Sequence, residues 1–234
     1  MESKLVVGRN SGERGFNGLG HQPQNPVIRV VAKVISYIFH PLFVPVYIAW
    51  FLLTVQPYLF SSGSPGQKML KLLQFFIMYS FFPLVTVLLA KALGFLSSVY
   101  LKTQKDRVIP YIACGIYYFW MAYVLRHLPD MSREVVQLSI AIFVASSVGL
   151  IANIYMKVSM HAMSMGIMVI FILMLASIQG ENFNLYIAAS ILLAGIVCTS
   201  RLIVSDHNSK EIYVGLMIGA FSQLLAPWID RILP

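Results

Sequence analysis

Seven apolar segments, each close to the length that crosses a bilayer, dominate this sequence. They run at 34–55, 72–90, 108–125, 135–156, 160–178, 184–200 and 212–229. A helix of about 20 apolar residues spans the hydrocarbon core of a membrane. The segments lack the alternating pattern of barrel strands, and lipid offers no partner to bare backbone groups. The sequence therefore predicts an all-α fold, a polytopic transmembrane helix bundle of six or seven spans.

Composition and charge agree with a membrane protein. Hydrophobic residues make up 58% of the chain and charged residues 11%, against about 25% charged in a soluble domain. Residues 1–28 are polar and predict a flexible tail, and residues 29–234 predict the transmembrane domain. The formal charge of +8 is scattered between apolar spans, which argues against a nucleic-acid partner and for the lipid bilayer. Cys114 and Cys198 lie in apolar runs and predict neither a disulfide framework nor a cysteine-ligated zinc site.

The first apolar segment differs from the others because it contains His40, Pro41 and Pro45. Proline lacks a backbone donor and kinks a helix. The segment therefore either spans with a kink or dips into the membrane and returns, and this choice separates seven spans from six.

Three polar clusters interrupt the apolar pattern, and charge beside a span marks a candidate functional site. They follow the second, fourth and sixth segments, so they share one membrane face if each intervening segment crosses once. The parity of the loops thus predicts that the three clusters converge on one site. The first contains Lys102, Lys105, Asp106, Arg107 and Pro110; the second Lys157, Ser159 and His161; the third Ser200, Arg201, Asp206, His207, Lys210 and Glu211.

The third cluster contains a histidine and a carboxylate at helical spacing. His207 and Glu211 are four residues apart, on one helix face. The carboxylate can fix the imidazole tautomer and leave the other ring nitrogen available to attack or to bind a metal.

The remaining side chains of the clusters are suited to an anion. Ser159 and His161 lie where a helix begins, and free amides there favour an anion. Cations of the kind that bind phosphate are present in each cluster, namely Arg107, Lys157 and Arg201.

These clusters resemble motifs of the type 2 phosphatidic acid phosphatase superfamily, and the likeness covers roughly residues 100–215. The third motif, Ser-Arg-x5-His-x3-Asp, is matched by Ser200, Arg201, His207 and Glu211, with Glu in place of Asp. The segment 157–161 keeps only Ser and His of the second motif, Pro-Ser-Gly-His. The first motif, Lys-x6-Arg-Pro, is matched poorly, since Lys102 precedes Arg107 by five residues and Pro110 follows it by three.

The resemblance implies a role for each matched residue. His207 would form a phosphohistidine, Glu211 would orient it, and His161 would protonate the leaving lipid oxygen. The phosphate would be bound by Arg201, Ser159, Lys157, Arg107 and Lys102. The substrate would be a lipid phosphate or isoprenoid diphosphate, without a metal or other cofactor.

The resemblance also implies a location, a multi-pass protein of the cell membrane and specifically of the bacterial inner membrane. An outer-face site follows from the resemblance. The distribution of Lys and Arg over seven spans instead favours the cytoplasmic face.

Three alternatives to the phosphatase remain open at this point. Loss of the motif glycine, replaced by Met160, is compatible with an inactive member that binds or transports a lipid or another anion. His161, His207 and Glu211 are also residue types that hold a metal. The third alternative is a structural membrane protein whose charges are interfacial anchors.

Overall fold

The computed structural model describes residues 25–60, 64–101, 103–129, 131–179, 182–204 and 207–233, and within these ranges the regular structure is helical. The elements in chain order are α1 (Pro26–Ile38), α2 (Val44–Val55), η2 (Pro57–Phe60), α3 (Pro65–Phe76), η3 (Ile77–Phe81), α4 (Phe82–Ala92), α5 (Gln104–Arg126), α6 (Arg133–Tyr155), α7 (Met160–Gln179), α8 (Asn184–Ile203) and α9 (Ser209–Ile232). The predicted all-α bundle is confirmed.

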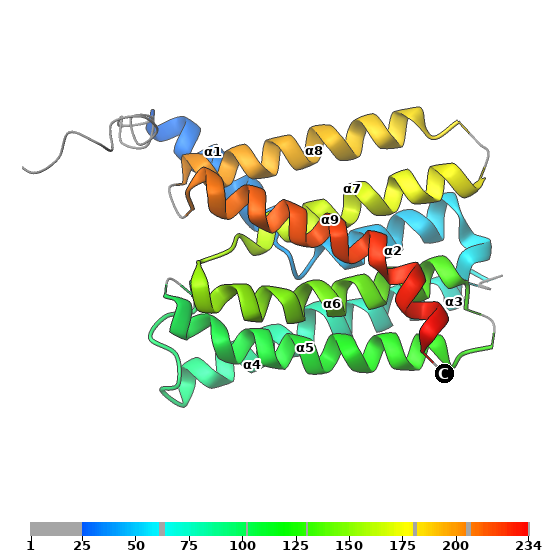
Figure 1. Ribbon diagram of the computed structural model, residues 1–234, viewed down its shortest axis with the longest axis horizontal. Helices are drawn as coiled ribbons and strands as arrows, with labels where there is room; N and C mark the ends of the chain where they lie inside the picture. The colour runs from blue at the N-terminus through cyan, green and yellow to red at the C-terminus, as the bar shows by residue number, and fades with distance from the viewer. Residues whose placement is uncertain are drawn as a thin grey trace, which may run out of the picture.

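Six helices of the described chain are long and apolar enough to cross a membrane. They are the continuous run 65–92, made of α3, the π-helical turn η3 and α4, together with α5, α6, α7, α8 and α9. Figure 1 shows these helices side by side with their axes roughly aligned, so the loops gather at two opposite ends of the bundle.

The first predicted segment, 34–55, is not one continuous helix, in agreement with the kink or return that its prolines predict. The chain forms two helices, α1 and α2, and residues 39–43 interrupt them where Pro41 removes a backbone donor. Helix α2 has 12 residues, about 18 Å of helix, which is too short to cross alone. Helix α1 begins at Pro26, inside the predicted tail; residues 1–24 lie outside the described part of the chain. In Figure 1 α1 and α2 together lead from one end of the bundle toward the other.

Side chains of neighbouring elements satisfy the backbone groups of this interruption. The Tyr47 hydroxyl donates to the Ile38 carbonyl at 2.9 Å, and the Ser80 hydroxyl donates to the Leu42 carbonyl at 2.7 Å. Irregular backbone is tolerated in a membrane protein where protein groups replace the missing hydrogen bonds. The break between α1 and α2 is therefore a built part of the fold.

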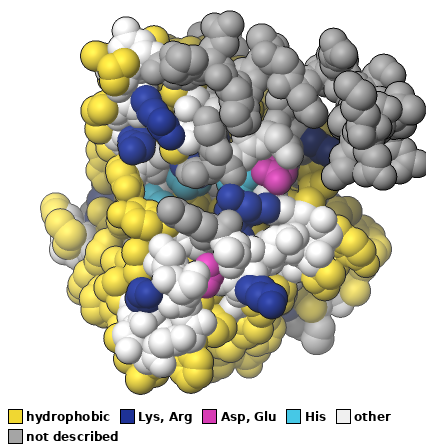
Figure 2. Space-filling view, turned by 90° about the vertical axis from the view of Figure 1, so that its left-hand side faces the viewer, with side chains coloured by type: hydrophobic (Ala, Val, Ile, Leu, Met, Phe, Trp, Pro, Cys, Tyr) yellow, Lys and Arg dark blue, Asp and Glu magenta, His cyan; other side chains and the backbone are white. Residues whose placement is uncertain are grey.

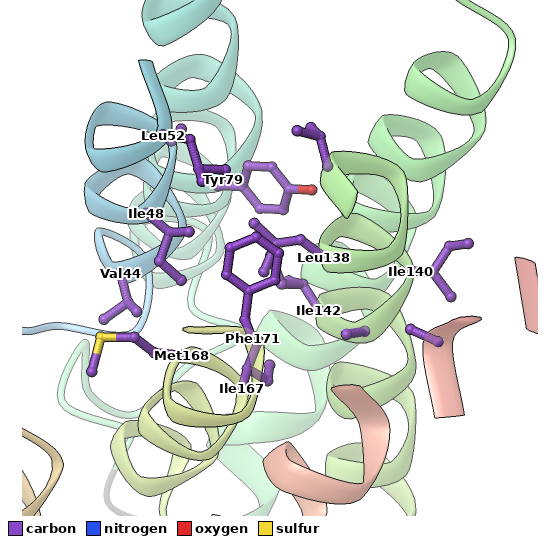
Figure 3. Close-up of a cluster of buried hydrophobic side chains, with 14 of the residues drawn as sticks. Val44, Ile48, Leu52, Tyr79, Leu138, Ile140, Ile142, Ile167, Met168 and Phe171 are labelled. Atoms are coloured by element: carbon purple, nitrogen blue, oxygen red, sulfur yellow. The ribbon is translucent and has the colours of Figure 1, made fainter. Parts of the chain in front are cut away.

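The buried core joins α2 to three other elements. Figure 3 shows one face of α2 turned toward α6, with side chains of η3 and α7 between them. This packing fixes α2 against the spanning helices although it is short itself. The buried side chains that make the contact are Val44, Ile48 and Leu52 of α2, Leu138 and Ile142 of α6, Tyr79 of η3 and Phe171 of α7.

Helices α7 and α9 approach each other more closely than side chains would allow. Gly215 and Gly219 are four residues apart on α9, and Gly166 faces this helix from α7. A Cβ at Gly215 would lie 2.6 Å from the Ser159 carbonyl oxygen, and one at Gly219 would overlap the Met163 carbonyl. Small residues at this spacing let helix backbones touch in membranes. The contact fixes the start of α7 against the start of α9.

Candidate active site

The loops that carry the three polar clusters meet at one end of the bundle. They connect α4 to α5, α6 to α7 and α8 to α9, and Figure 1 shows all three connections at the same end as α1. Figure 2 looks onto this end: histidine side chains are recessed near its middle, with Lys, Arg and acidic side chains around them. The convergence that loop parity predicts is thus present in the structure.

Asp106 organises the first of these loops. Its carboxylate accepts hydrogen bonds from the Ser97 amide at 2.8 Å, the Ser97 hydroxyl at 2.6 Å and the Thr103 hydroxyl at 2.8 Å. The residue after Thr103, Gln104, exchanges hydrogen bonds of 2.8 and 2.9 Å with Asn153 near the end of α6. These bonds fix the first turn of α5.

Arg107, in that first turn, connects the first cluster to the other two. Its Nε donates to the Leu101 carbonyl at 3.0 Å and its Nη1 to the Val158 carbonyl at 2.7 Å, while Nη2 lies 3.5 Å from Nε2 of His207. Leu101 has a φ of 50°, a left-handed conformation that costs a residue with a side chain about 1 kcal/mol or more. The orientation of Arg107 is therefore specified from two loops, one of them strained.

His207 and Glu211 form the pair that the sequence predicts. Nδ1 of His207 lies 2.9 Å from Oε2 of Glu211, and this oxygen also accepts the Asn208 amide at 3.2 Å. The Asn208 side chain in turn accepts the Glu211 amide at 2.9 Å, which completes a capping box at the start of α9. Because the carboxylate is an acceptor, the hydrogen-bond network assigns the ring proton to Nδ1 and a lone pair to Nε2.

His207 is neutral at pH 7 in this environment. Burial lowers its pKa from 6.5 to about 4, Arg107 adds to the effect and Glu211 opposes it, with smaller contributions from Arg201 and Lys157 that also lower the pKa. A neutral imidazole whose Nε2 lone pair faces a guanidinium has the protonation state of a nucleophile. An anion that replaces this contact between the two groups would place its central atom beside that lone pair.

The second cluster contributes mainly backbone contacts at the start of α7. Ser159 is fully buried, and its hydroxyl oxygen accepts the Ala162 amide at 3.4 Å. Its own amide donates to the Glu211 carbonyl at 3.2 Å. The start of α7 is thereby bonded directly to the first turn of α9, beside His207.

The predicted lysine ligands differ in what the structure describes of them. Lys157 is half-buried and acts electrostatically on His207. Lys102 lies outside the described residues, as does Asp206 of the third cluster.

His161 lies behind this group, with a partner that the sequence did not predict. Its Nε2 is 3.0 Å from the Ser36 carbonyl of α1, and its ring packs edge-on against His40, with centroids 5.3 Å apart. Arg201, buried in the last turn of α8, acts electrostatically on His40, His161 and His207. The break between α1 and α2 therefore forms one side of the site.

An apolar cavity of about 190 Å³ adjoins these side chains. Helices α2, α4, α5, α6 and α7 surround it, and Leu101, Tyr111 and Met160 are among the residues that line it. His40 is the imidazole that lines the cavity within the described part of the chain. The polar break in the first apolar segment was the sequence signal that pointed to His40, although no role for it followed from the sequence alone.

The histidines and carboxylates do not assemble a metal centre in the ranges that the structure describes: no three His, Cys, Asp or Glu side chains there are grouped to hold an ion. Comparison of the chain with models of known protein families, with curated proteins and with solved structures gave no match. The resemblance to the lipid phosphatases therefore depends on the motif residues themselves.

Proposed function

We propose that this protein is an integral membrane phosphatase that hydrolyses a lipid phosphate or an isoprenoid diphosphate through a phosphohistidine intermediate. The single observation that carries the proposal is the row of three side chains Glu211, His207 and Arg107. The carboxylate holds the proton on Nδ1, and the lone pair of Nε2 accepts a hydrogen bond from the guanidinium 3.5 Å away, which a bound phosphate would replace. A nucleophile, its orienting base and a phosphate ligand are thus adjacent.

In the proposed first step, Nε2 of His207 attacks phosphorus and the bond from phosphorus to the lipid oxygen breaks. The leaving oxygen takes a proton from Nδ1 of His161, which carries it as an imidazolium beside the bound phosphate, while the Nε2–H of that ring stays on the Ser36 carbonyl. In the second step water attacks phosphorus and gives a proton back to His161. The N–P bond breaks, which releases phosphate and restores free His207.

Cationic and polar groups around the nucleophile offset the charge of the transferred phosphoryl group in both steps. Arg107 contributes through its position beside Nε2 of His207, and Arg201 through its electrostatic action on that ring. The resemblance assigns the same role to Lys157, Lys102 and Ser159.

The adjoining cavity supports a lipid substrate. It is lined largely by apolar side chains and meets the polar site at Leu101, His40 and Met160. A substrate with an anionic headgroup and a hydrocarbon chain has both the charge and the apolar surface that this arrangement would bury. Part of a single acyl or isoprenoid chain fits a volume of about 190 Å³.

The proposal is tested with the purified protein in detergent micelles containing a chelator. We expect phosphate release from phosphatidic acid or farnesyl diphosphate and inhibition by vanadate. His207→Ala should lower turnover about 1,000-fold or more, because the nucleophile is lost. His127→Ala is the matched control, since this exposed histidine lies at the other end of α5, and should leave turnover unchanged.

Two results would contradict the phosphatase. Turnover that persists in His207→Ala would exclude this residue as the nucleophile. Saturable binding of both lipids by the wild type without phosphate release would instead identify a non-catalytic lipid or anion-binding protein, the alternative that replacement of the motif glycine by Met160 leaves open.

A further inference from the structure

The interruption between α1 and α2 places an imidazole at the junction between the apolar cavity and the polar site. His40 lines the cavity, and its ring contacts His161 with centroids 5.3 Å apart and planes 80° apart. His161, by contrast, is engaged with the Ser36 carbonyl. A chain held in the cavity would therefore reach His40 at the point where its headgroup enters the site.

The backbone fixes which ring nitrogen of His40 can donate. The Leu42 amide donates to Nδ1 of His40 at 3.3 Å, so the proton of the neutral ring is on Nε2. Pro41 lies between these two residues and holds the tight turn that brings the amide back to the ring. His40 is thus prepared as a hydrogen-bond donor through Nε2.

Two hydroxyl groups of the cavity wall are engaged elsewhere. The Tyr118 hydroxyl donates to the Tyr79 carbonyl at 3.4 Å, and the Ser164 hydroxyl donates to the His161 carbonyl at 2.8 Å. His40 combines two properties that these residues lack, since its ring contacts His161 and its N–H donor is oriented by the backbone.

We propose that His40 is a further residue of this site, which donates its Nε2–H to the oxygen that joins the phosphate of a lipid substrate to its hydrocarbon chain. The proposal rests on the proposed phosphatase function for its catalytic consequence. As the bond from phosphorus to that oxygen breaks, negative charge grows on the oxygen, and the hydrogen bond from His40 strengthens. His40 keeps its proton throughout, and the proton that completes the alcohol comes from His161.

Two substitutions distinguish the contribution of the His40 hydrogen-bond donor from that of its aromatic ring. His40→Phe keeps an aromatic ring against His161 but has no donor, whereas His40→Gln restores an N–H near the position of Nε2. Hexadecyl phosphate has a poor alkoxide leaving group and a chain for the cavity; p-nitrophenyl phosphate has neither. We expect His40→Phe to lower kcat on hexadecyl phosphate about 100-fold and to change turnover of p-nitrophenyl phosphate less than about threefold, with His40→Gln recovering most of the loss.

A binding measurement keeps the two proposals separate. In a His207→Ala background, which holds substrate without turnover, adding His40→Phe should weaken binding of hexadecyl phosphate about tenfold. It should leave binding of hexadecyl phosphonate, which lacks the bridging oxygen, unchanged. The binding result can show this selective weakening while the wild type releases no phosphate from hexadecyl phosphate, phosphatidic acid or farnesyl diphosphate. In that case the phosphatase is overturned and the contact of His40 with the bridging oxygen is kept.

The role of His40 is overturned by any of three results. These are an unchanged kcat of His40→Phe on hexadecyl phosphate, an equal loss on the alkyl and aryl phosphates, or His40→Gln as impaired as His40→Phe. Size-exclusion profiles and melting temperatures of the variants, compared with those of the wild type, show whether a loss reflects unfolding instead.

Discussion

Both ends of the bundle contain buried charges, but they use them differently. At the end opposite the candidate site, Asp230 of α9 is 3% exposed and bonds to Arg126 at 3.2 Å and Arg133 at 3.0 Å. Arg126 also donates to the backbone carbonyls of Asp230 at 3.0 Å and Leu233 at 2.6 Å. Both arginines bond to the one carboxylate there, and this network, the Asp230 clamp, ties α5 and α6 to the last turn of α9.

At the site end the described cations surround a neutral imidazole rather than a shared carboxylate. Arg107, Arg201 and Lys157 all act on His207, whereas Glu211 is engaged with that histidine and with a backbone amide. The comparison teaches that cations bonded to one shared carboxylate hold helices together, whereas cations gathered around a neutral imidazole favour the binding of an anion.

The largest expected effect separates the two kinds of arginine. Arg107→Ala should lower turnover of the lipid phosphate about 1,000-fold, because it removes the guanidinium that faces Nε2 of His207. Arg126→Ala should leave turnover within about twofold and lower the melting temperature in detergent. Arg107→Lys should recover little, since an ammonium group does not reproduce the bonds to Leu101 and Val158 together. Equal effects of the two alanine variants on turnover would refute the distinction.

A smaller effect tests the Asp230 clamp. Asp230→Asn removes the carboxylate charge that Arg126 and Arg133 share and should destabilise the protein by about 2 kcal/mol, measured as a lower melting temperature in detergent with turnover unchanged. The figure is moderate because the Arg133 side chain is 73% exposed, and exposed ion pairs contribute little. Arg133→Ala should therefore cost less than about 1 kcal/mol. A loss of turnover in Asp230→Asn without a change in melting temperature would contradict the clamp.

A still smaller effect concerns the pH dependence of turnover. Because burial lowers the His207 pKa from 6.5 to about 4, kcat/KM should stay high as pH falls through 6.5 and decline only near pH 4. Glu211 opposes this lowering, so Glu211→Gln should move the decline to still lower pH. Comparing the two profiles on one substrate removes the ionisation of the substrate phosphate. A decline near pH 6.5 in the wild type would show that the ring is not held neutral.

The His207 pKa also determines whether the stability of the folded protein rises or falls with pH, which is the smallest of the expected effects. Between about pH 4 and 6.5 the unfolded chain binds a proton on His207 that the folded protein excludes. The contribution of this group to folding is therefore complete above pH 6.5 and decreases as pH falls toward 4. His207→Ala should have a flatter dependence of melting temperature on pH across this range, whereas Asp230→Asn should keep the His207 contribution. Identical slopes for His207→Ala and the wild type would contradict the assignment.

The spans and the convergence of the three clusters were predictable because hydropathy and loop parity are properties of the chain alone. Arg107, His207 and Glu211 meet as that parity predicts. The role of the α1–α2 break was not predictable, since the contact between His161 and Ser36 joins residues 125 apart. The Asp230 clamp was likewise hidden, because its partners lie 104 and 97 residues away and only packing brings them together.

The glycine contact between α7 and α9 also limits how the site can move. With the backbone at Gly215 and Gly219 touching α7, the two helices have no side-chain layer through which to slide. His161 and His207 accordingly shift together as parts of one stiff unit.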